Sequence, residues 1–78
     1  SKTSFFDKQI KTTAYKKADL TKTIKKLQGE IAKVHRQVMI SNFKDTIALK
    51  KERRLTKKLI VFQEEHCYVY RELEVLKG

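Results

Sequence analysis

Apolar residues in this chain recur with the spacing of a helical seam. The first run advances by four and three residues in turn and contains Leu20, Ile24, Leu27, Ile31, Val34 and Val38. A second run has the same period and contains Ala48, Leu55, Leu59, Phe62, His66, Val69, Leu73 and Leu76, with Glu52 interrupting it. Such spacing keeps apolar side chains on the face of a helix that packs against another helix. The pattern therefore predicts two amphipathic helices.

The segment MISNFKD, from Met39 to Asp45, separates the two runs. Ser41, Asn42 and Asp45 are residue types that favour turns and helix N-caps. The simplest fold is all-α, an antiparallel two-helix coiled-coil hairpin in a single domain over residues 1–78. We expect a first arm at 18–40, a turn at 41–45 and a second arm at 46–77.

Residues 1–17 do not continue the first seam. Phe6, Ile10, Ala14 and Ala18 follow steps of four that drift out of phase with Leu20. A weak capping pattern, with Ser4 and Asp7, favours a helix start near this end. Two interpretations stay open: a short extra N-terminal helix precedes the hairpin, or the first arm starts early and rotates its apolar face.

A hairpin of this size buries only a small core. The chain has 78 residues, and its single cysteine, Cys67, rules out a disulfide framework and is typical of a reducing compartment. We therefore expect a partner, which is a second copy, another protein or nucleic acid. The balance of 19 basic against 9 acidic residues favours an anionic partner.

The basic residues concentrate in NFKDTIALKKERRLTKKL, which holds seven cations and two acids, Asp45 and Glu52. Helical phase places most of these cations opposite the second seam. Solvated helices commonly pair Lys with Glu four residues away, and this stretch lacks the acids to do so. The pattern favours anion binding over a merely solvated face. Residues 63–78 are more acidic, and we expect them to lie off the anionic surface or to face a basic neighbour.

Nucleic acid is the preferred anion. A basic hairpin can follow a phosphate backbone, and double-stranded RNA in particular is recognised by shape, phosphates and 2′-hydroxyls. The aromatic residues Phe62, Tyr68 and Tyr70 are not interleaved with the basic run, so stacking on single strands is disfavoured. No membrane partner is expected, because the narrow seams are committed to each other and the longest purely apolar run is Leu59–Phe62.

The sequence gives little indication of catalysis or of metal binding. His66 and its neighbour Cys67 supply two ligands where a structural zinc site needs four. Adjacent helical residues point about 100° apart, so these two do not form a nucleophile pair. We interpret His66 as packed or partner-facing, and expect no enzyme activity, no metal and no cofactor.

The segment ADLTKTIKKLQGEIAKVHRQ contains Asp19-Leu20, Ile24, Leu27, Glu30 and Val34-His35-Arg36-Gln37. In these positions it resembles the first arm of the large-subunit ribosomal protein twenty-nine family. The family's second-arm signature falls, without a gap, on Leu49-Lys50, Arg53-Arg54 and Lys58. The chain departs from the family at Glu52 and Thr56, which replace apolar residues, at Lys57, which replaces a small residue, and at His35, which replaces arginine.

This resemblance implies a structural constituent of the ribosome. The family's hairpin packs on large-subunit ribosomal RNA near the exit-tunnel rim, beside neighbouring ribosomal proteins. The resemblance implies RNA contacts from Arg36, Lys50, Arg53, Arg54 and Lys58, and the basic face itself adds Lys44, Lys51 and Lys57. The expected location is intracellular, on a cytosolic or an organellar ribosome.

An alternative interpretation belongs to another functional class. The two long seams, with His66 on one of them, are also typical of a basic coiled-coil interaction module. Such a module would form a homo-oligomer, a four-helix bundle, and dock on an acidic protein or on DNA.

Overall fold

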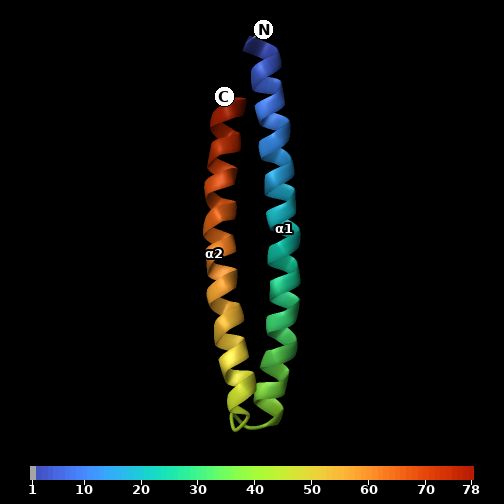
Figure 1. Cartoon of the computed structure of the whole chain (residues 1–78), viewed down its shortest axis with the longest axis vertical. Helices are drawn as coiled ribbons and strands as arrows, with labels where there is room; N and C mark the ends of the chain where they lie inside the picture. Colours follow the sequence, from blue (N-terminus) through green and yellow to red (C-terminus); the bar gives the residue numbers. More distant parts are fainter. Residues whose placement is uncertain (1) are drawn as a thin grey trace.

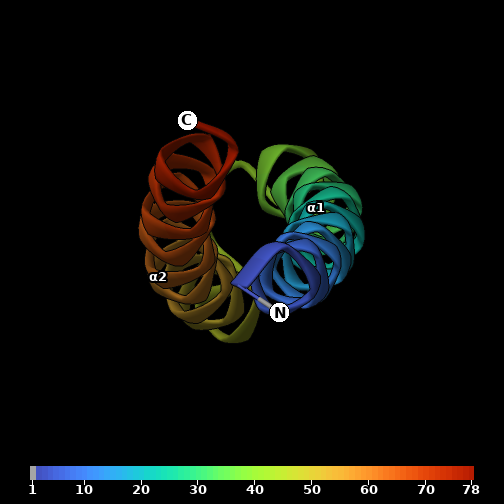
Figure 2. The same ribbon diagram turned by 90° about the horizontal axis from the view of Figure 1, so that it is seen from above.

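The computed structural model describes residues 2–78, with side chains from residue 3 onward. It contains α1 (Lys2–Ile40) and α2 (Thr46–Lys77), which run antiparallel and lie side by side (Figure 1). The two helices wind around each other, as the view along the long axis shows (Figure 2). Together they form a rod of 61 × 15 × 14 Å. The predicted all-α, two-helix hairpin is therefore confirmed.

The core is the seam between the two helices. Its buried apolar residues are Leu20, Leu27, Val38, Ala48, Leu55, Val69 and Leu73. All seven belong to the two predicted runs, and Val38 and Val69 are fully buried. The other members of the runs are buried only in part. Each helix has one neighbour, so only side chains that point straight at that neighbour lose all contact with water.

Residues 2–17 belong to α1, so a separate N-terminal helix is wrong for this part of the chain. The helix begins at Lys2, so Ser4 and Asp7 lie inside it and not at its start. The arm does start early, but of the four apolar residues, Phe6, Ala14 and Ala18 are exposed and Ile10 is only half-buried. The helix keeps the phase of Leu20, which brings Thr13, seven residues earlier, into the buried seam. Ala14 lies exposed beside it.

The turn at 41–45 is held by backbone hydrogen bonds. The Phe43 amide donates to the Val38 carbonyl oxygen (2.9 Å), and the Asn42 amide donates to that of Met39 (3.0 Å). Asn42 has φ 55°, so the two bonds form a Schellman C-cap with Asn42 at the left-handed position. Asp45 is the N-cap of α2, and its carboxylate accepts from the Ala48 amide (3.0 Å). These contacts reverse the chain without proline or glycine.

The seam predicts where substitutions destabilise the hairpin. Leu27→Ala should lower the free energy of unfolding by about 2–3 kcal/mol, because it removes buried methyl groups and leaves a cavity. Val75→Ala, at an exposed helical position, should change it by less than about 0.5 kcal/mol. Thermal unfolding followed by circular dichroism measures both. Equal losses in the two variants would contradict a core confined to this seam.

Candidate nucleic-acid interface

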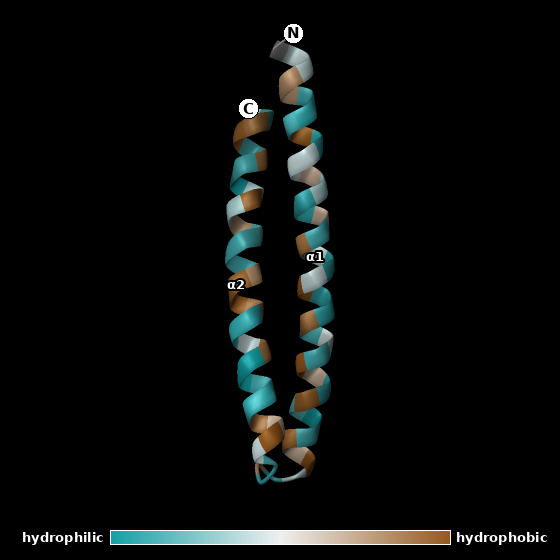
Figure 3. Ribbon diagram, viewed as in Figure 1, coloured by the Kyte–Doolittle hydropathy of each residue, from teal (hydrophilic) through white to brown (hydrophobic). Residues whose placement is uncertain are grey.

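Six cations lie on one part of α2, and we call them the basic band. The band contains Lys50, Lys51, Arg53, Arg54, Lys57 and Lys58, and all six are exposed. Leu55, within this stretch, points into the seam and sets the helix orientation. At about 100° per residue, Lys50, Arg54 and Lys57 then face away from α1. The hydrophilic colour over this part of α2 marks the band, next to the turn (Figure 3).

Four members of the band surround a single hollow. Lys50, Arg53, Arg54 and Lys57 line a shallow depression of about 250 Å³ on the surface of α2. Their spacing of three and four residues stacks them along the same side of the helix. The structure thus brings together four of the eight predicted RNA-binding residues around a space in which an anionic oxygen group can lie.

The other four predicted residues are exposed but separate from that hollow. Lys51 lines a different depression, between the helices, together with Lys33 and Ile47. Lys58 is the C-terminal member of the band, Arg36 lies on α1, and Lys44 lies in the turn. The predicted set therefore forms one compact group with cations distributed around it.

Carboxylates do not neutralise the band. Arg54 has a lysine at each of its four helical neighbour positions: Lys50, Lys51, Lys57 and Lys58. In the part of the chain that the structure describes, no ion pair reaches any of the eight predicted residues. The two nearby acids are engaged elsewhere, because Asp45 caps α2 and Glu52 binds His35. The band thus keeps a strong net positive charge, with six cations against the single carboxylate of Glu52.

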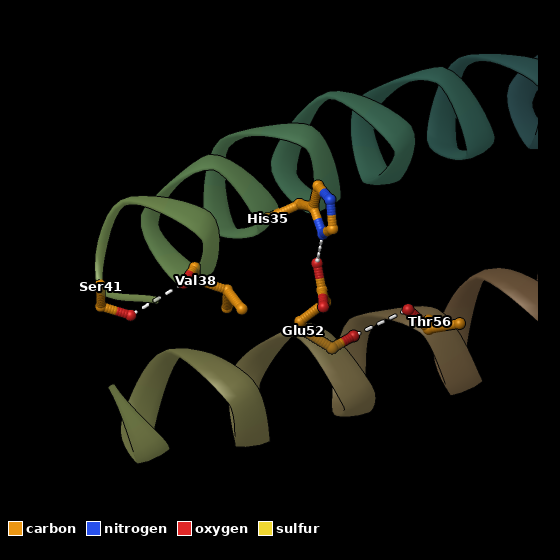
Figure 4. Close-up of polar contacts among 5 residues, drawn as sticks. All are labelled: His35, Val38, Ser41, Glu52 and Thr56. Carbon is orange, nitrogen blue, oxygen red and sulfur yellow. Dashed lines mark hydrogen bonds and ion pairs between the residues drawn. The ribbon is translucent and has the colours of Figure 1, made fainter. Parts of the chain in front are cut away.

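His35 and Glu52 form a contact that the sequence analysis missed. The His35 Nδ1 atom lies 2.7 Å from Glu52 Oε2, across the seam from α1 to α2 (Figure 4). The position of the turn fixes which residues of the two helices face each other, and this register would have predicted the contact. Residue numbers sum to 87 in this pair, in the Thr21–His66 hydrogen bond and in the Lys17–Tyr70 contact. A turn centred near residue 43 implies such a sum, and Glu52 "interrupts" the seam because it meets His35 there.

His66 is half-buried and contacts α1, which agrees with the first of the two predicted alternatives, packed or partner-facing. The Thr21 hydroxyl donates to the Lys17 carbonyl oxygen (3.0 Å), so its oxygen accepts from His66 Nε2 at 3.2 Å. Cys67, the next residue, is exposed. Among the described residues, no group of three or more His, Cys, Asp and Glu side chains could hold a metal ion, and no helix is long and apolar enough to cross a membrane.

The acidic C-terminal part of α2 meets basic residues of α1. Glu65 lies 3.9 Å from the Lys16 ammonium group, and the Lys17 ammonium group lies 4.8 Å from the centre of the Tyr70 ring. The basic neighbour expected for this segment is thus, in part, the first helix of the same chain. These exposed contacts contribute little stability, but they balance charge at the end of the rod far from the turn.

Comparisons with protein families, with curated proteins and with solved structures gave no match. The likeness to the ribosomal family therefore rests on the two sequence segments described above.

The crowding around Arg54 predicts a stabilising substitution. Arg54→Gln removes four like-charge neighbour pairs, and each pair destabilises a helix by a few tenths of a kcal/mol. The variant should be more stable by up to about 1 kcal/mol in low salt, and the gain should vanish as salt screens the charges. Denaturant unfolding at two ionic strengths measures the difference.

Arg71→Gln is the matched control. Arg71 has Glu74 three residues ahead and no cation at a neighbouring helical position, so the same substitution should give no gain in stability. A salt-independent gain in Arg54→Gln, or an equal gain in Arg71→Gln, would contradict self-repulsion within the band.

Proposed function

We propose that this protein binds RNA through the basic band and serves as a structural constituent of the large ribosomal subunit. The observation that carries the proposal is the group of exposed cations around Arg54, which form no ion pair in the part of the chain that the structure describes. Helices that display charge only for solubility mix both signs. The resemblance to the ribosomal family supports large-subunit ribosomal RNA as the ligand.

The shape of the band suits phosphates better than bases. From Lys50 to Lys58 the band extends about 12 Å along a convex helix. A convex surface has no pocket for a base, whereas long Lys and Arg side chains reach phosphate oxygens and 2′-hydroxyls of a duplex. Arg53 and Arg54 can each donate two parallel hydrogen bonds to one phosphate. Lys51 and Lys58, at the edges, extend the contact to adjoining phosphates.

A small core is consistent with this role. The hairpin has a single seam, and burial of its few apolar side chains gives only a small free energy of unfolding. Binding of RNA would stabilise the folded chain by mass action and offset the repulsion within the band. Affinity should fall steeply with salt, since each neutralised phosphate releases counterions.

The proposal is tested with the double variant Arg53→Glu and Arg54→Glu. Tagged protein is sedimented from a lysate of its own cells on sucrose gradients, at moderate and at high salt. The unaltered protein should migrate with the large ribosomal subunit, and the variant should lose this association almost completely. Circular dichroism should show the helical content of the variant unchanged, because both residues face away from the seam.

The matched control is Arg71→Glu with Lys77→Glu, which changes net charge equally outside the band and should still co-sediment. Retained association of the band variant, or migration of the unaltered protein as a small free species, would rule out the ribosomal function.

A second candidate function rests on a different observation. Val61, Tyr68 and Val75 are exposed, seven residues apart, on the side of α2 that faces away from α1. If a second copy packed antiparallel with Val61 on the two-fold axis, Lys50 would face Glu72 of that copy. Arg54 would likewise face Tyr68 of the second copy, and Ile47 would face Val75. This arrangement is the four-helix bundle of an oligomerising module, and it would cover the basic band.

Light scattering, which measures the oligomeric state, tests whether the chain is such a module. It predicts a dimer that Val61→Asp dissociates, because two aspartates would then meet at the axis. Ile60→Asp is the matched control, since Ile60 is also exposed but points about 100° away from the Val61 line. A chain that stays monomeric at every concentration would rule out the oligomeric module.

A further inference from the structure

Four large apolar side chains gather at the end of the rod where the chain reverses. Ile40 and Ile47 are each 80% exposed, Phe43 is 54% exposed and Met39 is 53% exposed. We call these four residues the apolar tip. Figure 3 shows hydrophobic colour on both helices beside the turn. Single exposed apolar residues are ordinary on protein surfaces, but a group that caps one end of a molecule indicates a binding surface.

The backbone under the apolar tip is held firmly. Every amide from Ser41 to Asp45 donates a hydrogen bond, and the Asp45 amide does so to the Ser41 hydroxyl oxygen (3.2 Å). That hydroxyl in turn donates to the Val38 carbonyl oxygen at 2.9 Å (Figure 4). Little conformational entropy is therefore lost when the tip is buried by a partner.

The backbone of Phe43 has an unusual conformation. It has φ 63°, the left-handed region that a bulky side chain rarely adopts. The Schellman cap requires this conformation at Asn42, the residue before it, and not at Phe43. The backbone at Phe43 is therefore strained. The aromatic ring at this strained position is about half exposed at the end of the rod.

The charges around the apolar tip are mostly positive. Lys33, Arg36, Lys44, Lys50 and Lys51 are exposed within one or two helical turns of it. The acids of this region are engaged, Asp45 as the N-cap and Glu52 with His35. Val75 and Tyr68, in contrast, are exposed among glutamates. A partner for the apolar tip must therefore combine an apolar interior with an anionic rim.

We propose that the apolar tip inserts into the interface of an anionic lipid bilayer, with the surrounding cations at the headgroup phosphates. Three of the four side chains are aliphatic, so stacking on nucleobases does not account for them. A convex tip would need a matching cavity in a protein, whereas a bilayer accommodates any convex apolar shape. Apolar burial together with attraction between cations and anionic lipids is the established basis of interfacial binding.

The geometry of the rod agrees with this partner. Glu64, the first acid beyond the band, lies 17 residues after Ile47, or about 25 Å along α2. That distance exceeds the Debye length of about 8 Å at physiological salt, so the acidic segment does not repel the membrane. The narrow helix faces that disfavour a membrane are those committed to the seam, and the apolar tip is a different surface. The inference is also independent of the RNA-binding function.

A single tryptophan reports insertion directly, because the chain contains none. In Phe43→Trp, vesicles of phosphatidylcholine with phosphatidylserine should shift the emission to the blue, and lipids brominated near the headgroup should quench it. Vesicles of phosphatidylcholine alone should have much less effect. Val75→Trp, at the far end of α2, should respond to neither vesicle. If Phe43→Trp loses helicity, Ile47→Trp takes its place as the reporter.

Paired substitutions separate insertion from attraction of a basic protein to any anionic surface. Ile40→Asp with Ile47→Asp should weaken binding to the anionic vesicles at least about tenfold, at unchanged helicity. Val61→Asp with Val75→Asp carries the same charge change away from the tip and should bind nearly as the unaltered chain does.

Equal blue shifts for tryptophan at 43 and at 75, or equal losses in the two double variants, would overturn insertion by the tip. So would a response of the tryptophan at 43 to duplex RNA and not to vesicles. RNA binding should survive the tip substitutions and fail in Arg53→Glu with Arg54→Glu, so the two proposals fail separately.

Discussion

The α1–α2 seam is the interaction on which the rest of the structure depends. Each helix packs on one neighbour, and the buried apolar side chains form a single row between them. Among the described residues, the one other buried side chain is that of Thr13, so 36% of the residues can be charged without burial of a charge. The same geometry limits stability, because a two-layer rod removes little apolar surface from water. The functional surfaces are therefore outward helix faces and ends, and not clefts.

Polar residues within the seam specify its register. A seven-residue apolar repeat tolerates a slip of one heptad, since apolar groups would still meet. Such a slip would move Glu52 from His35 to Gln28 or Asn42, and would break the 2.7 Å contact between His35 and Glu52. The Thr21–His66 bond would be lost by the same slip. With the N-cap at Asp45, these contacts make one pairing of the helices more stable than its neighbours.

Much of this fold follows from the sequence, because the seams and the turn are local patterns. The N-terminal segment shows the limit: Ala14 and Ala18 suggested an apolar face, but without a helix breaker the phase of Leu20 continued and brought Thr13 inward. The exposure of the basic band also follows from helical periodicity. The His35–Glu52 contact could not be predicted without the register of the hairpin. The apolar tip could not be predicted without the geometry of the turn, which brings Ile40 and Ile47 to the same end.

The two proposed surfaces are continuous, and the charge of the whole rod explains how both would meet an anionic partner. Residues 29–58, which lie on either side of the turn, hold nine basic and three acidic side chains. The other 48 residues of the chain hold ten basic and six acidic side chains, so positive charge is more concentrated next to the turn. An anionic surface therefore attracts the rod turn-first. Lys50 begins the band three residues after Ile47, so electrostatic approach brings the apolar tip and the cations of the band to the same surface.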